Sequence, residues 1–202
     1  MEISPTDWLD TAKKIQLPSH GPLPIRRALV IHFTGGASAR SSIDAMRQRG
    51  VSAHLTIDRD GTIFQSIPFS QIAFHAGASR WEDPKTGIRY IGMNSYSIGI
   101  ELANAGNDPD ALAWAKKQAG FSIFTGKHQN GGPIEAWENY ATQQLASLFS
   151  VAKLLVDRYN LDDITGHDCI APKRKNDPGP AFPMLRLRTY CGFVGLPKVF
   201  PH

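Results

Sequence analysis

Short runs of hydrophobic residues along the chain predict three β-strands in its first third. Residues 27–33 form a nearly continuous apolar run that ends at Thr34-Gly35-Gly36, which is typical of a buried strand. Residues 51–58 and 62–67 are two further apolar-rich runs. The Asp60-Gly61 dipeptide between them tolerates the positive φ of a tight turn, so we predict a β-hairpin there.

Alternation of polar and apolar positions predicts another strand at residues 97–103. Ile98, Ile100 and Leu102 fall on one face of this strand, whereas Gly99 and Glu101 fall on the other. The glycine leaves room beside the glutamate, so the Glu101 carboxylate has space to act on a bound molecule.

Helical spacing of apolar residues predicts helices in three places. Residues 38–49 are typical of a helix, with Gly50 at the C-cap position. Ser4-Pro5-Thr6-Asp7 begins like a capped helix, which a proline-rich linker at 18–24 would follow. The clearest helix spans 137–159. Its apolar positions are Trp137, Tyr140, Ala141, Leu145, Leu148, Phe149, Ala152, Leu155, Val156 and Tyr159.

The order of these elements predicts an α/β fold: a single domain with a central mixed β-sheet flanked by helices. Residues 104–136 are rich in Gly, Asn and Pro, and we predict a long loop insertion there with a short helix at 111–117. The chain then divides into an N-terminal helix and linker (1–26), the domain itself (27–190) and a C-terminal tail (191–202).

Composition agrees with one globular domain. The chain has 202 residues, 42% of them hydrophobic, which suffices for a buried core. The net charge of +4 favours contact with anionic polymers, such as cell-wall glycans or nucleic acid. The basic residues are dispersed apart from Lys173-Arg174-Lys175, and no base-stacking motif accompanies them, so we do not expect nucleic-acid binding.

Compartment and redox state are constrained by the N-terminus and the two cysteines. No signal peptide is visible, and no apolar run approaches the ~20 residues that span a bilayer. We therefore expect a protein made in the cytoplasm without a membrane span, although removal of a leader would give the same sequence. Cys169 and Cys191 lack CxxC spacing; two reduced, partly buried thiols are favoured, with a single bridge as the alternative.

Two of the seven histidines lie where a metal site would need them. His32 ends the strand at 27–33, and His167 precedes Asp177 by ten residues. Pro178-Gly179 predicts a tight turn that would hold the Asp177 carboxylate rigidly. Two neutral imidazoles and a carboxylate form a zinc-binding set that leaves a fourth position for water. This spacing also arises by chance, so it does not establish a site by itself.

Four segments give the chain a specific resemblance. They are 30–34 (VIHFT), 73–77 (AFHAG), 97–102 (SIGIEL) and 166–180 (GHDCIAPKRKNDPGP). In this order they resemble the N-acetylmuramoyl-L-alanine amidase type 2 family, which includes muropeptide-recycling amidases, outer-membrane amidases, phage amidase-type lysozymes (endolysins) and peptidoglycan recognition proteins. The likeness runs from about Ala28 to Phe182, interrupted by the 104–136 insertion, which we expect to form a specificity wall or lid.

The resemblance implies a zinc hydrolase that cuts the amide between N-acetylmuramic acid and L-alanine in peptidoglycan or muropeptides. It implies one Zn²⁺ per chain, held by His32, His167 and Asp177, and catalytic roles for Glu101 and Lys175. The chemistry is consistent with this: zinc activates water, Glu101 would carry the proton, and Lys175 would face the developing oxyanion. A solvated strand carboxylate and a surface charge are the alternative readings of Glu101 and Lys175.

The resemblance also places His75 in the substrate cleft, and His54 is better read as structural. From their position alone we predict that Trp81, Tyr90 and Asn94 line the cleft, with exposed loop residues as the alternative. The expected partner is peptidoglycan or a muropeptide, and the expected state is a monomer. Two settings stay open: cytoplasmic turnover of anhydro-muropeptides, and lysis of the intact wall after release by a holin.

Two alternative functions also remain. One is a non-catalytic peptidoglycan-binding recognition module, as some members of the family are; such a module would be expected to have lost a zinc ligand. The other is a zinc hydrolase that acts on some different amide, because loops set the specificity.

Overall fold

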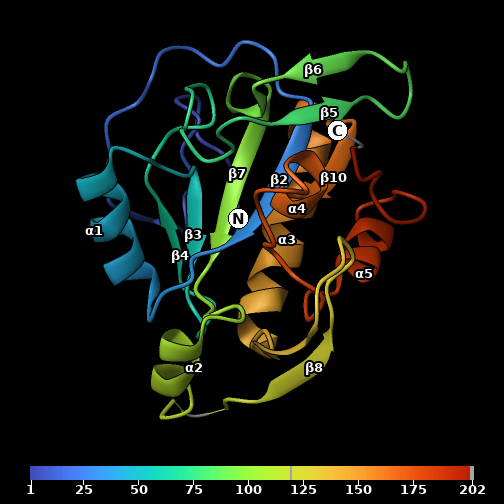
Figure 1. Cartoon of the computed structure of the whole chain (residues 1–202). Helices are drawn as coiled ribbons and strands as arrows, with labels where there is room; N and C mark the ends of the chain where they lie inside the picture. Colours follow the sequence, from blue (N-terminus) through green and yellow to red (C-terminus); the bar gives the residue numbers. More distant parts are fainter. Residues whose placement is uncertain (119, 201–202) are drawn as a thin grey trace.

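A mixed six-stranded β-sheet organises the computed structural model, which describes residues 1–118 and 120–200. The strand order is β1-β4-β3-β7-β2-β10 (Figure 1). The strands β10, β2, β7 and β3 run parallel, β3 and β4 are antiparallel, and β1 is parallel to β4. Their bounds are β1 Lys13–Lys14, β2 Ala28–Phe33, β3 Leu55–Ile57, β4 Ile63–Gln65, β7 Ser97–Leu102 and β10 Asp163–Gly166.

The main core lies between this sheet and the long helix α3 (Thr142–Tyr159) (Figure 1). Ile98, Ile100 and Leu102 of β7 are buried in that core, as their alternation predicts. Helix α1 (Ala39–Arg49) packs beside β3 and β4 and borders the opposite face, to which Glu101 belongs. The remaining helices are η1 (Met93–Ser95), α2 (Pro109–Ala115), α4 (His167–Ile170) and α5 (Met184–Tyr190).

Several predicted elements are confirmed. Helix α1 begins after Ser38, whose side chain caps the helix, and ends at Gly50, whose φ is 66°. The predicted hairpin is the antiparallel pair β3 and β4, and β2 and β7 lie at the predicted strands. The α/β fold with a central mixed sheet is likewise confirmed.

The predicted N-terminal helix is wrong. Ser4 and Trp8 close a turn through a backbone hydrogen bond of 2.8 Å, and the Leu9 amide donates to the Gln65 side chain at 2.7 Å. Lys13–Lys14 then pairs with β4. The backbone groups of this segment therefore form hydrogen bonds with the edge of the sheet, where a helix would have formed them within itself. Leu9 is buried there, at 1% exposure.

The prediction of a long irregular loop at 104–136 is only partly right. The short helix exists as α2, but the rest contains a hairpin of β8 (Ile123–Lys127) and β9 (Ile134–Glu138). Trp137 belongs to β9 and pairs with Phe124, so α3 starts at Thr142 and not at 137. Trp137 continues the apolar pattern of the helix because its side chain is also buried, at 1% exposure, although it belongs to a strand.

A smaller hairpin, β5 (Arg80–Glu82) and β6 (Arg89–Ile91), was not predicted. Cys169 and Cys191 are both buried free thiols, as the favoured reading had it. Among the described residues, no helix combines the length and the apolar character that crossing a bilayer requires.

Candidate active site

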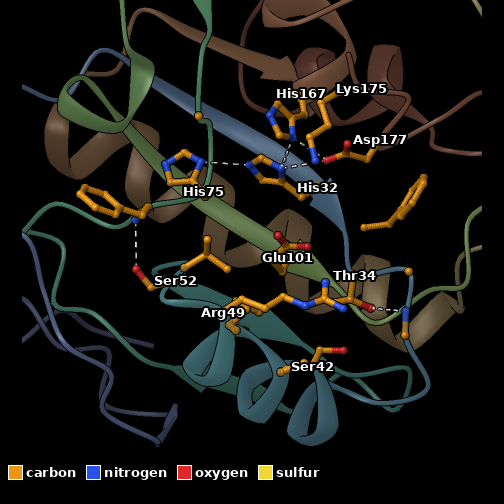
Figure 2. A pocket seen from close by; sticks show the side chains of 18 of the residues that line it. His32, Thr34, Ser42, Arg49, Ser52, His75, Glu101, His167, Lys175 and Asp177 are labelled. Atoms are coloured by element: carbon orange, nitrogen blue, oxygen red, sulfur yellow. Dashed lines mark hydrogen bonds and ion pairs between the residues drawn. The ribbon is translucent and has the colours of Figure 1, made fainter.

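A cavity of about 810 Å³ opens on the face of the sheet opposite α3. Its floor is formed by the ends of β2 and β7, one wall by α1, and the other by the segments 74–77 and 174–177 (Figure 2). Every predicted metal ligand and both predicted catalytic residues line it: His32, Glu101, His167, Lys175 and Asp177. Residues more than 130 positions apart in sequence thus meet in one place.

His32, His167 and Asp177 converge on a single point. The Nδ1 atoms of His32 and His167 are 2.9 Å apart, and the Oδ2 atom of Asp177 lies 2.9 Å from the first and 3.0 Å from the second. His32 comes from β2, His167 begins α4 directly after β10, and Asp177 comes from the following loop. All three side chains are buried.

The chemistry of these donors fits a cation. The Nε2 atom of His167 faces the Ala76 carbonyl at 3.1 Å, and a carbonyl only accepts, so the proton of a neutral His167 lies on Nε2. Its Nδ1 lone pair then points at the cluster, as does the acceptor-only carboxylate. Donor atoms around a tetrahedral zinc lie about 3.3 Å apart, so the cluster needs only a small expansion to hold one.

The loop that carries Asp177 is held from several sides. The Asp168 amide donates to the Asp177 carbonyl at 2.7 Å, and the Tyr140 hydroxyl donates to the Pro178 carbonyl at 2.7 Å. Gly179 has a φ of 74°, and a Cβ there would come within 2.8 Å of the Trp137 ring. The predicted rigid turn is therefore present, and it needs glycine for both conformation and space.

Burial and the charges of neighbouring groups shift the pKa values of His32 and Asp177. Burial, and then the neighbouring His167, lower the pKa of His32 to about 4. Burial alone would raise the pKa of Asp177, but His167 and His32 hold the pKa of that carboxyl well below its usual value. The cluster thus combines a carboxylate with an imidazole that stays neutral near pH 7, as metal ligation requires.

Glu101 lies beside His32, because the two are register partners on the parallel strands β7 and β2. Its Oε2 atom is buried and has no hydrogen-bond partner among the described residues. Burial raises the pKa of Glu101 well above its usual value, and the charge of Asp177 adds to this, whereas Lys175 opposes it. A carboxyl in this state binds a proton strongly.

Lys175 extends toward the same point as the three clustered side chains (Figure 2). The preceding Arg174 is occupied, since its guanidinium donates to the carbonyls of Ala76 at 2.7 Å and Ala78 at 2.8 Å. Lys173 is exposed and does not line the cavity. Of the basic run 173–175, only Lys175 places an ammonium group at the cluster. The alternative prediction, that Lys175 is one more surface charge, therefore does not fit its position.

The predicted cleft residues fall into different places. His75 and Asn94 line the cavity, but both make hydrogen bonds within the protein there. Trp81 is 3% exposed, and its indole N–H donates to Asp163 at 2.9 Å, so the structure buries it with Tyr90 rather than bringing it to the cavity. The alternative prediction for this segment is exposed loop residues, and the buried Trp81 contradicts that prediction as well.

Arg49 is a cavity residue that the sequence analysis missed. It is exposed at the end of α1, and Figure 2 shows its side chain reaching across the cavity toward Thr34. Among the described residues it has no ion-pair partner. Its position depends on how α1 packs against the sheet, so no local sequence signal distinguishes it from Arg47.

The inserted segment 104–136 makes contacts with helix α4 and with the loop that carries Asp177, and it does not cover the cavity. His128 lies 3.1 Å from the Asp168 carboxylate, and the Asn130 side chain donates to the Asp168 carbonyl at 2.8 Å. On the other side, Asn176 donates to Asn107 at 3.0 Å. No described residue of 104–136 is among those that line the cavity, so the expected wall or lid is not formed by this segment here.

Comparisons with known proteins identify relatives of the chain. A family model described as N-acetylmuramoyl-L-alanine amidase matches residues 22–180. The chain is 31% identical over 188 residues to N-acetylmuramoyl-L-alanine amidase AmiD of Escherichia coli, with 89% of this chain and 56% of that protein covered. It is 37% identical over 141 residues to 1,6-anhydro-N-acetylmuramyl-L-alanine amidase AmpD of the same organism, with 69% and 57% covered.

One solved structure is similar over nearly the whole chain. It is the complex of AmiD from E. coli with the substrate anhydro-N-acetylmuramic acid-L-Ala-D-gamma-Glu-L-Lys, at a TM-score of 0.63 and 27% identity. The match covers 96% of this chain and 66% of that one. The chain thus spans somewhat more than half the length of the two curated relatives it matches here.

Proposed function

Because the chain belongs to the N-acetylmuramoyl-L-alanine amidase family, we propose that it hydrolyses the amide between N-acetylmuramic acid and L-alanine in peptidoglycan or muropeptides. The observation that carries the proposal is the convergence of His32, His167 and Asp177 in the cavity that also contains Glu101. A recognition module without activity is disfavoured, because it needs neither three converging ligands nor a buried carboxyl oxygen that lacks a hydrogen-bond partner among the described residues.

In this proposal one zinc ion per chain would be held by His32, His167 and Asp177. A bound zinc ion would supply Lewis-acid activation of water and of the amide carbonyl at neutral pH. The donor set suits zinc, since two imidazoles and one carboxylate leave a position open for water or substrate.

Glu101 would carry the proton of the reaction. Its carboxylate takes a proton from the attacking water and returns one to the nitrogen of L-alanine as the amide bond breaks. The products are then the free lactyl carboxyl of the sugar and the free amine of the peptide. The raised pKa of Glu101 supports the second half of this role, because a carboxyl that has taken up a proton holds it until the proton passes to the leaving nitrogen.

Two cations would act on the substrate. The Lys175 ammonium faces the centre of the site and would stabilise the negative charge that develops on the amide oxygen. Arg49 lies on the cavity wall without an ionic partner in the part of the chain that the structure describes, and it would pair with a carboxylate of the peptide stem. Lys175 therefore belongs to the chemical step, whereas Arg49 belongs to binding.

Defined substrates test the proposal. The full chain is incubated with a soluble anhydro-muropeptide and, separately, with intact sacculi, and the products are identified by mass. Release of the intact peptide stem, lost on chelation and restored by zinc, supports the proposal. Activity on the soluble substrate alone would favour recycling, and activity on sacculi would favour wall lysis. Failure of the zinc-loaded protein on both substrates overturns it.

A further inference from the structure

We propose that the dipeptide His75-Ala76 is the positioning element of the metal site, and that it orients both histidine ligands from behind. Each histidine of the cluster uses its Nδ1 atom toward the common point and its Nε2 atom toward this dipeptide. The inference rests on the proposed function, because it takes His32 and His167 to be ligands. It gives His75 a role different from direct contact with the substrate.

For His167 the partner is the backbone of the dipeptide. The Nε2 atom lies 3.1 Å from the Ala76 carbonyl, which accepts only, so Nε2 is the protonated nitrogen. The Arg174 guanidinium lies 3.3 Å from Nε2, but it donates to the Ala76 carbonyl at 2.7 Å and to the Ala78 carbonyl at 2.8 Å, so Nε2 keeps its own proton. The contact of Nε2 with the Ala76 carbonyl fixes both the tautomer and the ring angle of His167.

For His32 the partner is the side chain of the dipeptide. Its Nε2 atom lies 3.0 Å from His75 Nδ1, and the other nitrogen of His75 faces the Ser97 hydroxyl at 3.5 Å. The Ser97 hydroxyl donates its own proton to the Met93 carbonyl at 2.5 Å, so toward His75 it acts as an acceptor. A His75 ring protonated on Nε2 fits these contacts, and such a ring accepts on Nδ1, which makes His32 the donor.

The reverse direction conflicts with a metal site. If His75 donated from Nδ1, His32 would have to accept on Nε2 and carry its proton on Nδ1. That proton would point into the cluster, against His167 Nδ1 and Asp177 Oδ2. The chain of hydrogen bonds from Met93 through Ser97 and His75 thus selects the tautomer of His32 that can bind a cation.

The dipeptide is itself held rigidly. The Asn94 side-chain oxygen accepts from the His75 amide at 3.0 Å and from the Ala76 amide at 2.7 Å. The His75 ring lies flat over Gly99 of β7, where a Cβ would come within 2.4 Å of it. Gly99 therefore makes room for His75, and Asn94 holds the backbone of the dipeptide, which accounts for the presence of His75 and Asn94 in the cavity lining.

Zinc affinity of two nearly isosteric variants tests the inference. His75→Asn keeps an acceptor close to the position of Nδ1, whereas His75→Leu has a similar size and no acceptor. The full chain is made metal-free, and zinc binding is measured by competition with a chromophoric chelator. We expect His75→Leu to bind zinc about 10–100-fold more weakly than the wild type and His75→Asn to stay within about threefold. Unchanged affinity in His75→Leu, or an equal loss in both variants, overturns the inference.

Two controls keep the outcomes separate. A wild-type chain that binds no zinc contradicts the proposed function itself, whereas a zinc-binding wild type with an unaffected His75→Leu variant contradicts only this inference. Should His75→Leu fail to unfold cooperatively in its metal-free form, the tautomers are read directly in the zinc-loaded wild type by ¹⁵N NMR of the imidazoles. A His75 ring protonated on Nε2 supports the inference, and a proton on Nδ1 of His75 overturns it.

Discussion

Glu101 and His32 are adjacent register partners on the parallel strands β7 and β2, so their side chains leave the same face of the sheet next to each other. Partners in register on neighbouring strands lie about 5 Å apart. The rigid sheet therefore sets the distance between the Glu101 carboxyl and one predicted ligand. In the proposed function this arrangement would separate binding of the metal, which would use His32, from movement of the proton, which would use Glu101.

Replacement of Glu101 by glutamine is expected to remove activity and to leave zinc binding intact. The amide has the shape of the carboxyl group but cannot take up the proton, so the rate should fall by ~10²–10⁴-fold. Turnover of a defined muropeptide and zinc content per chain are the two measurements. Glu2→Gln is the control for loss of a negative charge, because Glu2 is exposed and outside the cavity lining. A change in rate below threefold would remove Glu101 from the mechanism.

Replacement of His167 by alanine is expected to abolish both zinc binding and activity. The variant loses one of the three proposed ligands, and the Asp177 carboxylate loses its neighbouring Nδ1 atom at 3.0 Å. Metal analysis of the purified protein measures the first effect, and muropeptide hydrolysis the second. His20→Ala changes an exposed histidine outside the cavity lining and should keep both properties. Full zinc occupancy in His167→Ala would show that the ligand set is wrong.

Sequence predicted the site better than the elements around it. His32, Glu101, His167, Lys175 and Asp177 each belong to a distinctive local segment, and the structure brings all five to one cavity. Their segments are short and have strong local signals: a strand end, an alternating strand and a tight turn. Resemblance to a family supplied the connection between them.

The remaining features depend on contacts between distant segments. Trp137 has helical spacing to Tyr140 and Ala141, but pairing with Phe124 places it in a strand. Trp81 looked like a cleft residue from its place between His75 and Glu101, yet its indole N–H reaches Asp163, 82 residues away. The pairing of His75 with His32 likewise spans 43 residues, so the supporting role of His75 could not be read from local sequence.

Lys175 is expected to contribute to the chemical step more than to substrate binding. Its ammonium lies beside the cluster, where negative charge develops as the amide is attacked. Lys175→Ala should therefore lower kcat more strongly than it raises KM, and Lys173→Ala should change neither, because Lys173 is exposed and outside the cavity lining. Steady-state kinetics on one muropeptide measures both variants. A higher KM at unchanged kcat would make Lys175 a binding residue instead.

Arg49 is expected to show the opposite pattern. It is an exposed cation on the cavity wall, and a carboxylate of the peptide stem would supply its missing partner. Arg49→Ala should raise KM at nearly constant kcat, and the effect should shrink for a substrate whose stem carboxylate is amidated. Arg47→Ala is the matched control, since Arg47 lies on the same helix and pairs with Asp44 at 3.1 Å. Equal effects of Arg49→Ala on both substrates would contradict a carboxylate contact.

His54 is expected to make the fold less stable in mild acid. It is fully buried, it accepts from the Gly99 amide at 3.0 Å, and its other ring nitrogen faces the Gln71 carbonyl at 2.9 Å. Burial, opposed by the hydrogen bond to Gln71, lowers the pKa of His54 from 6.5 to about 4. Below pH 6.5 the unfolded chain therefore takes up a proton that the folded chain does not, so stability falls as the pH drops toward 4. The loss amounts to about 2 kcal/mol between pH 7 and pH 5.

Urea unfolding of metal-free wild type and of His54→Gln at the two pH values isolates this contribution from that of His32. The variant should be less stable overall but lose less stability on acidification, and an equal loss in both proteins would show that His54 does not titrate in this way.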